Sequence, residues 1–328
     1  MEIQEIFINR AGRLRSGWRL AVFALILFFA IQLAYMMAVT VVTTVFGPAA
    51  PDVLDSSWGF LLQGLVFLVP ATLVGWACGK LLEDLPPRAL GWGFHKGWLR
   101  DLLFGSLVGA LSLLLATAMA AAAGTLKFTL NSPVMFETVG RTLLTSLPIF
   151  ILAAAGEEAI FRGYPLQTMG RSRLAWVAIV ITSVVFSYGH LGNPNAVPGF
   201  TFANTAIAGA WLAVAYLKTR SLWFPLGIHW AWNWMMGSVL GLPVSGIERL
   251  TPEPLLRATD QGPAWLTGGA YGIEGGAACT VALLLSTLFI WRTRLVSPTE
   301  EMLRLTDQEN PSNDERGTMN DGLKIDRF

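Results

Sequence analysis

Charged side chains are scarce in this chain. Lysine, arginine, aspartate and glutamate make up only 14% of its 328 residues, whereas hydrophobic residues make up 53%. Soluble domains carry about 25% charged residues, so the composition excludes an ordinary soluble domain and predicts a polytopic membrane protein. The formal net charge is only +1. We therefore expect no nucleic-acid partner, because nucleic-acid-binding proteins usually show a concentrated basic surface.

Cysteine is also rare, with two residues in the chain. Cys78 and Cys279 both lie in apolar segments, and they form neither a CxxC pair nor any other close spacing. This pattern argues against a disulfide framework or a cysteine-based zinc site. We interpret both residues as small buried hydrophobic side chains.

Long hydrophobic runs, by contrast, are abundant. The first follows an arginine-rich N-terminus and extends from about residue 20 to 46. A cleavable signal peptide has an apolar core of about 7–15 residues, so this run is interpreted as a retained membrane span. At about 20 apolar residues per crossing, the sequence predicts an all-α polytopic membrane protein with about eight transmembrane helices and an intramembrane active-site cavity. The predicted helices cover residues 18–46, 58–82, 102–124, 142–162, 174–193, 200–217, 222–241 and 272–291.

These runs divide the chain into four expected regions. Residues 1–84 hold a basic N-terminal segment and two spans, and residues 85–241 form the catalytic membrane core. Residues 242–296 form an outer loop and the last span, and residues 297–328 form a polar tail that we expect to be disordered. The aromatic and basic segment 85–100, which contains His95, either lies flat in the membrane interface or is an ordinary connecting loop.

Basic residues predict the orientation of the chain. Lysine and arginine concentrate in the N-terminus and in every second connection, and cytoplasmic loops usually carry this excess. We therefore expect a multi-pass protein of the cell membrane with both termini in the cytoplasm. Four basic residues do not follow the pattern, namely Lys127, Arg141, Arg249 and Arg257.

Three short patterns place polar groups inside the apolar runs. They are Glu157-Glu158-Ala-Ile-Phe-Arg162, Phe186-Ser-Tyr-Gly-His190 and His229-Trp-Ala-Trp-Asn233. A charged side chain at the bilayer centre costs at least about 2.5–3.5 kcal/mol, so such residues usually line a functional cavity. Together they offer the groups that hydrolysis needs.

The spacing of these residues suggests a division of roles. Glu158 and Arg162 are four apart and face each other on a helix, which predicts a structural ion pair. The alternative is that Glu157, Glu158 and Arg162 only cap a membrane span at the cytoplasmic interface. Glu157 points about 100° away and is free for chemistry. We expect Glu157 and His190 to activate water, and His229 and Asn233 to stabilise the oxyanion.

The same residues resemble the type II CAAX prenyl protease family, also called the Abi or CPBP group. Its pattern is EExxxR, FxxxH and HxxxN or HxxxD on successive membrane helices, and this chain matches it over about residues 85–241. The resemblance implies an intramembrane endopeptidase that acts on a prenylated protein or another membrane-associated peptide substrate. Its expected partners are therefore the lipid bilayer and a protein or peptide.

Two questions stay open at this stage. The family is often called a metalloprotease, and zinc (Zn) bound by Glu157, His190 and His229 is one alternative. The wide spacing of these residues lacks the compact HExxH arrangement, so we favour chemistry without a cofactor. The alternative functions are a transporter that uses the same intramembrane polar residues and a non-catalytic membrane scaffold.

Overall fold

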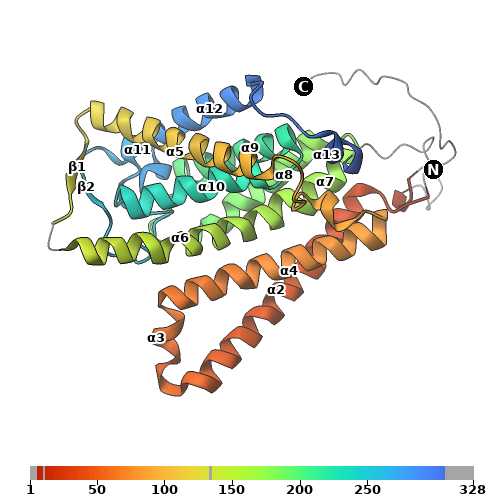
Figure 1. Ribbon diagram of the computed structural model, residues 1–328, viewed down its shortest axis with the longest axis horizontal. Coiled ribbons are helices and arrows are strands. Elements are labelled where there is room, and N and C mark those ends of the chain that lie inside the picture. Colours follow the sequence, from red (N-terminus) through yellow and green to blue (C-terminus); the bar gives the residue numbers. More distant parts are fainter. Residues whose placement is uncertain (1–5, 10–11, 133–134, 307–328) are drawn as a thin grey trace.

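The computed structural model describes residues 6–9, 12–132 and 135–306 and is mostly helical (Figure 1). A helix occupies each of the eight ranges predicted above. These helices are α2 (Ser16–Phe46), α4 (Ser57–Glu83), α5 (Trp98–Ala122), α6 (Phe136–Glu158), α8 (Ala175–His190), α9 (Phe200–Thr219), α10 (Trp223–Trp234) and α12 (Ala277–Arg292). The shorter helices are α3 (Ala50–Leu54), α7 (Tyr164–Arg171), α11 (Ala264–Thr267) and α13 (Glu300–Leu305).

Five helical segments of the described chain are long and apolar enough to cross a membrane. They are Ser16–Leu54, Ser57–Glu83, Trp98–Ala122, Phe136–Arg171 and Phe200–Thr219. The apolar helices α8 and α12 have only 16 residues each. A polytopic membrane protein is therefore supported, while the number of eight spans stays a prediction.

Two strands modify the all-α prediction. Strand β1 (Leu126–Leu130) pairs antiparallel with β2 (Leu256–Asp260), and Phe128 lies opposite Ala258. Neither strand was predicted, because each is too short to show an alternating pattern of its own. The pair forms a two-stranded sheet at one end of the helices (Figure 1).

Helix α10 lies at the centre of the fold. It packs against α5, α6 and α9, and the largest apolar core gathers around α5, α9, α10 and α12. A Cβ atom at Gly109 would lie 2.2 Å from the Ile228 carbonyl oxygen, and one at Gly227 would lie 2.2 Å from the Leu102 carbonyl oxygen. The two backbones thus approach through small residues, a common arrangement in membrane proteins.

The first helices form an extension of this bundle. Helices α2 and α4 lie side by side near the α7 end and diverge toward α3 (Figure 1). Arg19 Nη1 lies 2.9 Å from Glu83 Oε2, and Arg171 Nη1 lies 3.2 Å from the same oxygen. The Arg19 and Glu83 side chains are fully buried. This cluster links α2, α4 and α7.

The helix that carries Glu157 continues further than predicted. The sequence predicted a helix ending near residue 162. Instead, a π-helical segment, η4 (Ala159–Gly163), connects α6 to α7, and Pro165 lies in the first turn of α7. Proline has no N–H for the carbonyl four residues earlier. The wider π turn just before it accommodates this loss without ending the helix.

The structure also gives new information on the polar tail and on segment 85–100. Residues 300–305 of the predicted disordered tail form α13, where Met302 is buried and Glu301 pairs with Arg88. The rest of the tail, residues 307–328, lies outside the described residues. Segment 85–100 forms a folded connection with a short 3₁₀ turn, η2 (Pro87–Leu90), and its last residues begin α5. Its position relative to the membrane interface stays a prediction.

His95 and the two cysteines are buried. His95 is buried in the connection, with Nε2 3.1 Å from Ser221 Oγ and 3.6 Å from Asp101 Oδ2. Cys78 and Cys279 are free and buried, as predicted.

Candidate active site

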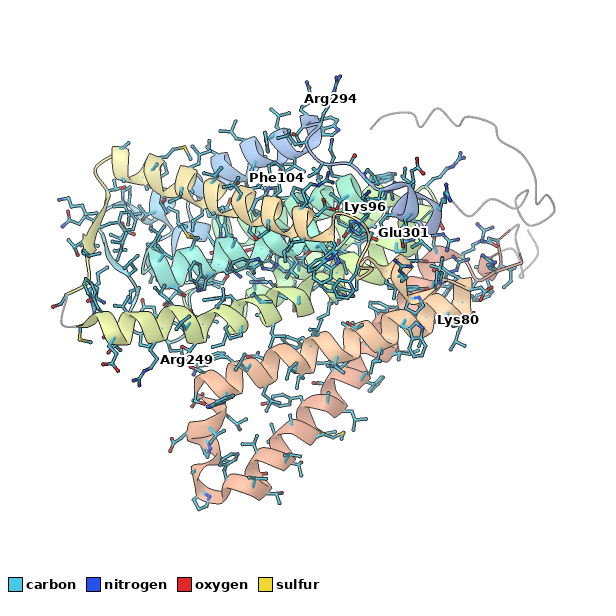
Figure 2. The ribbon with its side chains drawn as sticks, viewed as in Figure 1. Lys80, Lys96, Phe104, Arg249, Arg294 and Glu301 are labelled. Carbon is cyan, nitrogen blue, oxygen red and sulfur yellow. The ribbon has the colours of Figure 1, made fainter. Side chains whose placement is uncertain are left out.

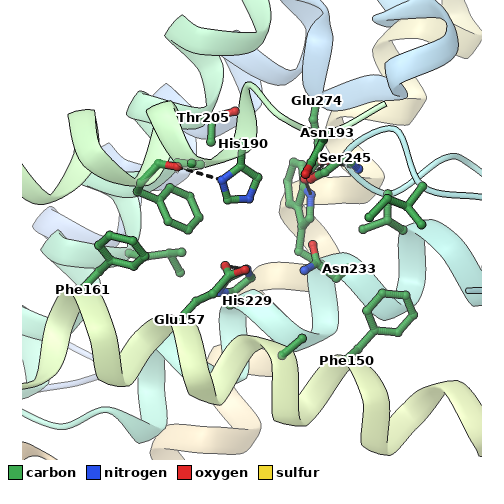
Figure 3. Close-up of a pocket in the computed structure, with 18 of the residues that line it drawn as sticks. Phe150, Glu157, Phe161, His190, Asn193, Thr205, His229, Asn233, Ser245 and Glu274 are labelled. Atoms are coloured by element: carbon green, nitrogen blue, oxygen red, sulfur yellow. Dashed lines mark hydrogen bonds and ion pairs between the residues drawn. The ribbon is translucent and has the colours of Figure 1, made fainter. Parts of the chain in front are cut away.

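One cavity of about 460 Å³ brings the three sequence patterns together. Its wall includes Glu157 at the end of α6, His190 at the end of α8, and His229 and Asn233 on α10. Figure 3 shows His190 facing Glu157 and His229 across the cavity, and Asn233 lies beside His229. Residues that are far apart in the sequence and belong to three different helices thus share one site.

The adjacent glutamates Glu157 and Glu158 have different surroundings. The Glu158 side chain is fully buried, whereas that of Glu157 is 27% exposed and lines the cavity. Arg162 Nη1 donates to Glu158 Oε1 over 3.1 Å, and Arg162 Nη2 donates to the Gly209 carbonyl over 3.2 Å. The structure therefore contains the ion pair Glu158–Arg162 and keeps it behind the cavity wall.

His229 lies between the two carboxylates. Its Nδ1 is 2.8 Å from Glu158 Oε1, and its Nε2 is 3.5 Å from Glu157 Oε2. A carboxylate is a hydrogen-bond acceptor, so Nδ1–H donates to Glu158 and orients the ring. Nε2 is then directed toward Glu157 and the cavity.

His190 is oriented by its own helix. Its Nδ1 lies 2.8 Å from the Phe186 carbonyl oxygen. A carbonyl only accepts hydrogen bonds, so the proton of a neutral ring is on Nδ1. The lone pair on Nε2 is then available to accept a proton, as a general base requires.

Phe186, the aromatic residue of the second pattern, packs among the polar groups. Its ring centroid is 4.5 Å from that of His190 and 6.2 Å from that of His229. The Arg162 guanidinium carbon lies 4.7 Å from the same centroid. This ring therefore contacts residues of all three patterns and fixes their spacing.

Sequence reasoning missed the carboxylate of Glu274 in this cavity. It precedes α12, and Trp232 Nε1 donates to its Oε1 over 3.1 Å. Ser245 donates to its Oε2 through both the backbone N–H and Oγ, each over 2.8 Å. A single acidic residue among glycines before an apolar run was the available signal.

The predicted zinc ligands do not form a three-ligand group. Across residues 6–9, 12–132 and 135–306, no three histidine, cysteine, aspartate or glutamate side chains are placed to share an ion. Glu157 and His229 approach each other, whereas His190 lies across the cavity (Figure 3). In this arrangement the three residues do not present a zinc site, and the zinc alternative stays a prediction.

Part of the chain is similar to known proteins. Residues 139–235 match the family model of the Rce1-like type II CAAX prenyl endopeptidases. A segment of 109 residues is 33% identical to the uncharacterized 24.3 kDa protein of Escherichia coli and covers 32% of this chain. That segment spans 46% of the relative, about half its length. No solved structure matches the chain. The match of residues 139–235 to the Rce1-like family model supports the resemblance that the three patterns predicted.

Proposed function

We propose that this protein is an intramembrane endopeptidase that hydrolyses a peptide bond of a prenylated or other membrane-associated substrate. One observation carries the proposal. Glu157, His190, His229 and Asn233, from three separate apolar helices, line a single cavity. The family match supports a CAAX-type peptide hydrolase at the level of the family.

Water activation is assigned to Glu157 and His190. The two side chains face each other across the cavity (Figure 3), so a water molecule between them would contact both bases. One base accepts a proton while the water oxygen attacks the scissile carbonyl carbon. The same proton is then returned to the leaving nitrogen, and the peptide C–N bond breaks.

Stabilisation of the oxyanion is assigned to His229 and Asn233. Asn233 presents a carboxamide that donates without any change of charge. His229 donates from Nε2 when both ring nitrogens carry protons, with Nδ1 held by Glu158. Donors that act on charge developing in the transition state are worth about 10²–10³ in kcat.

Three variants test these roles. Glu157→Ala and His190→Ala should each abolish proteolysis while membrane insertion and expression stay near the wild-type level. Asn233→Ala should lower kcat about 10²–10³-fold with little change in KM, as expected for a donor that acts only in the transition state. Robust turnover by Glu157→Ala would refute its role in water activation.

The substrate search compares three strains by quantitative membrane proteomics. One lacks the gene, one carries Glu157→Ala, and one carries the wild type. A protease predicts that the first two strains accumulate the same uncleaved protein. A non-catalytic scaffold or a transporter whose function does not need Glu157 predicts that the Glu157→Ala strain instead resembles the wild type.

The metal content of the purified protein decides the cofactor question. A cofactor-free mechanism predicts full activity in protein from which metals have been removed. Stoichiometric zinc that is lost from His229→Ala, together with reversible inactivation by chelators, would contradict this mechanism and support the zinc alternative.

A further inference from the structure

When the two lining histidines are neutral, the charged side chains that line the cavity are both acidic. They are Glu157 and Glu274, and none of the described lining residues is a lysine or an arginine. Arg162 is fully buried behind the wall, where it pairs with Glu158. Low-dielectric walls strengthen the field of charges in a cleft. This cavity therefore favours cationic groups over anionic ones.

Hydrogen bonds hold the Glu274 carboxylate in this wall. It is fixed from two sides, because Trp232 belongs to α10 and Ser245 belongs to the outer segment that follows it. An ionised carboxylate offers about four acceptor sites, and Trp232 and Ser245 use three of them. Within the part of the chain that the structure describes, Oε1 accepts from a single donor, the Trp232 indole, so it retains the capacity for one more.

The proposed mechanism does not use this carboxylate. Its hydrogen-bond partners among the described residues are Trp232 and Ser245, and neither is assigned to the chemistry. Figure 3 shows Glu274 and Ser245 together, on the side of the cavity away from Glu157 and His229. A substrate bound at the reacting groups would therefore extend toward Glu274.

We propose that Glu274 is a specificity-determining residue that binds a cationic side chain of the substrate, a lysine or an arginine near the scissile bond. The inference rests on the proposed function and names the substrate class of the same site. A hydrogen bond between charged groups changes affinity by about tenfold or more. The competing explanation is that Glu274 only anchors the outer segment to Trp232, which predicts no preference for charge.

A retention experiment separates these explanations. The full-length protein is immobilised in phosphatidylcholine nanodiscs at neutral pH. It is exposed to a synthetic pool of short apolar peptides, acetylated and amidated at their ends, in which one position is lysine, glutamine or glutamate. Mass spectrometry measures the retained fractions. We expect the lysine peptides to be retained about tenfold over the glutamate peptides, with glutamine between them.

Variants assign the preference to one side chain. Glu274→Gln should bring the lysine-to-glutamine ratio close to one, and Glu274→Asp should keep its direction. Glu248→Gln is the matched control, because Glu248 is an exposed carboxylate of the same outer segment and its loss should leave the ratio unchanged. Each ratio is measured within one protein, so a lower yield of folded variant does not alter it.

Three results would overturn the inference. They are equal retention of lysine and glutamate peptides by the wild type, no retention of the lysine peptides, and an unchanged preference in Glu274→Gln. Retention requires no turnover. Absence of Glu157-dependent proteolysis with an intact lysine preference would therefore refute only the proposed function, and the reverse pattern would refute only this inference.

Discussion

At the scale of single residues, two adjacent glutamates of one helix have different surroundings. Arg162 Nη1 and His229 Nδ1 both lie within 3.1 Å of Glu158 Oε1, and the Glu158 side chain is fully buried. Glu157 is partly exposed to the cavity. The spacing of four residues was sufficient to predict the Glu158–Arg162 pair. The contact between Glu158 and His229 joins residues 71 positions apart, and no local pattern indicates it.

Removal of Glu158 should therefore affect stability as well as activity. Glu158→Ala leaves Arg162 fully buried without its carboxylate, and loss of one partner of a buried ion pair costs about 3–5 kcal/mol. We expect a lower yield of folded protein and a lower midpoint of thermal unfolding in detergent. Glu157→Ala is the matched control and should unfold near the wild-type temperature. Equal midpoints for the two variants would contradict the separation of roles.

At the scale of elements, the position of His229 depends on the close approach of α5 and α10. Gly227 lies two residues before His229, and a Cβ atom there would meet Leu102 O at 2.2 Å and Ser106 N at 2.8 Å. Both contacts are to backbone atoms, so no side chain can rotate away. The sequence showed small residues in these helices, but it did not show which helix they contact.

Gly227→Ala should separate the two helices and displace His229. Overpacking of this kind costs about 1–3 kcal/mol, so thermal unfolding should begin at a lower temperature and activity should fall. Gly140→Ala is the control within a helix, because a Cβ atom at Gly140 meets nothing within 4 Å. That change should be neutral or stabilise by about 0.5–1 kcal/mol. A Gly227→Ala variant as stable and active as the wild type would show that α5 and α10 do not need this contact.

At the scale of the whole molecule, basic residues lie at different positions along the long axis. Figure 2 shows Lys80, Lys96 and Arg294 toward the half that contains α7 and α13, and Arg249 in the other half. Position 172 lies between α7 and α8, and position 196 lies between α8 and α9, at the opposite end of α8. The predicted orientation places position 172 in the cytoplasm.

Cysteine labelling tests this orientation. In a background without Cys78 and Cys279, Ala196→Cys should react with an impermeant reagent added outside intact cells. Ser172→Cys should react only after the membrane is opened. The reverse result would overturn the orientation predicted from the basic residues, without changing the arrangement of the cavity.

The sequence by itself determined the class of the fold, the positions of the long helices and the residues worth testing. It could do so because membrane spans require continuous apolar runs, and because charged groups within such runs are costly enough to mark a site. It did not predict β1, β2, α13 or the π turn before Pro165. Each of these is stabilised by contacts with distant segments or by local backbone adjustments that leave no periodic pattern.

Only the tertiary structure decided which side chains share a cavity. Glu157, His190, His229 and Glu274 come from four segments, and their convergence depends on how the helices pack. Periodicity reports which face of a helix is apolar, but it does not report the depth or the neighbour of each helix. The tautomer of His190, the orientation of His229 and the position of Glu274 in the wall all follow from contacts made on folding. For that reason the residues of the candidate site could be selected from the sequence, whereas its geometry and its acidic lining required the structure.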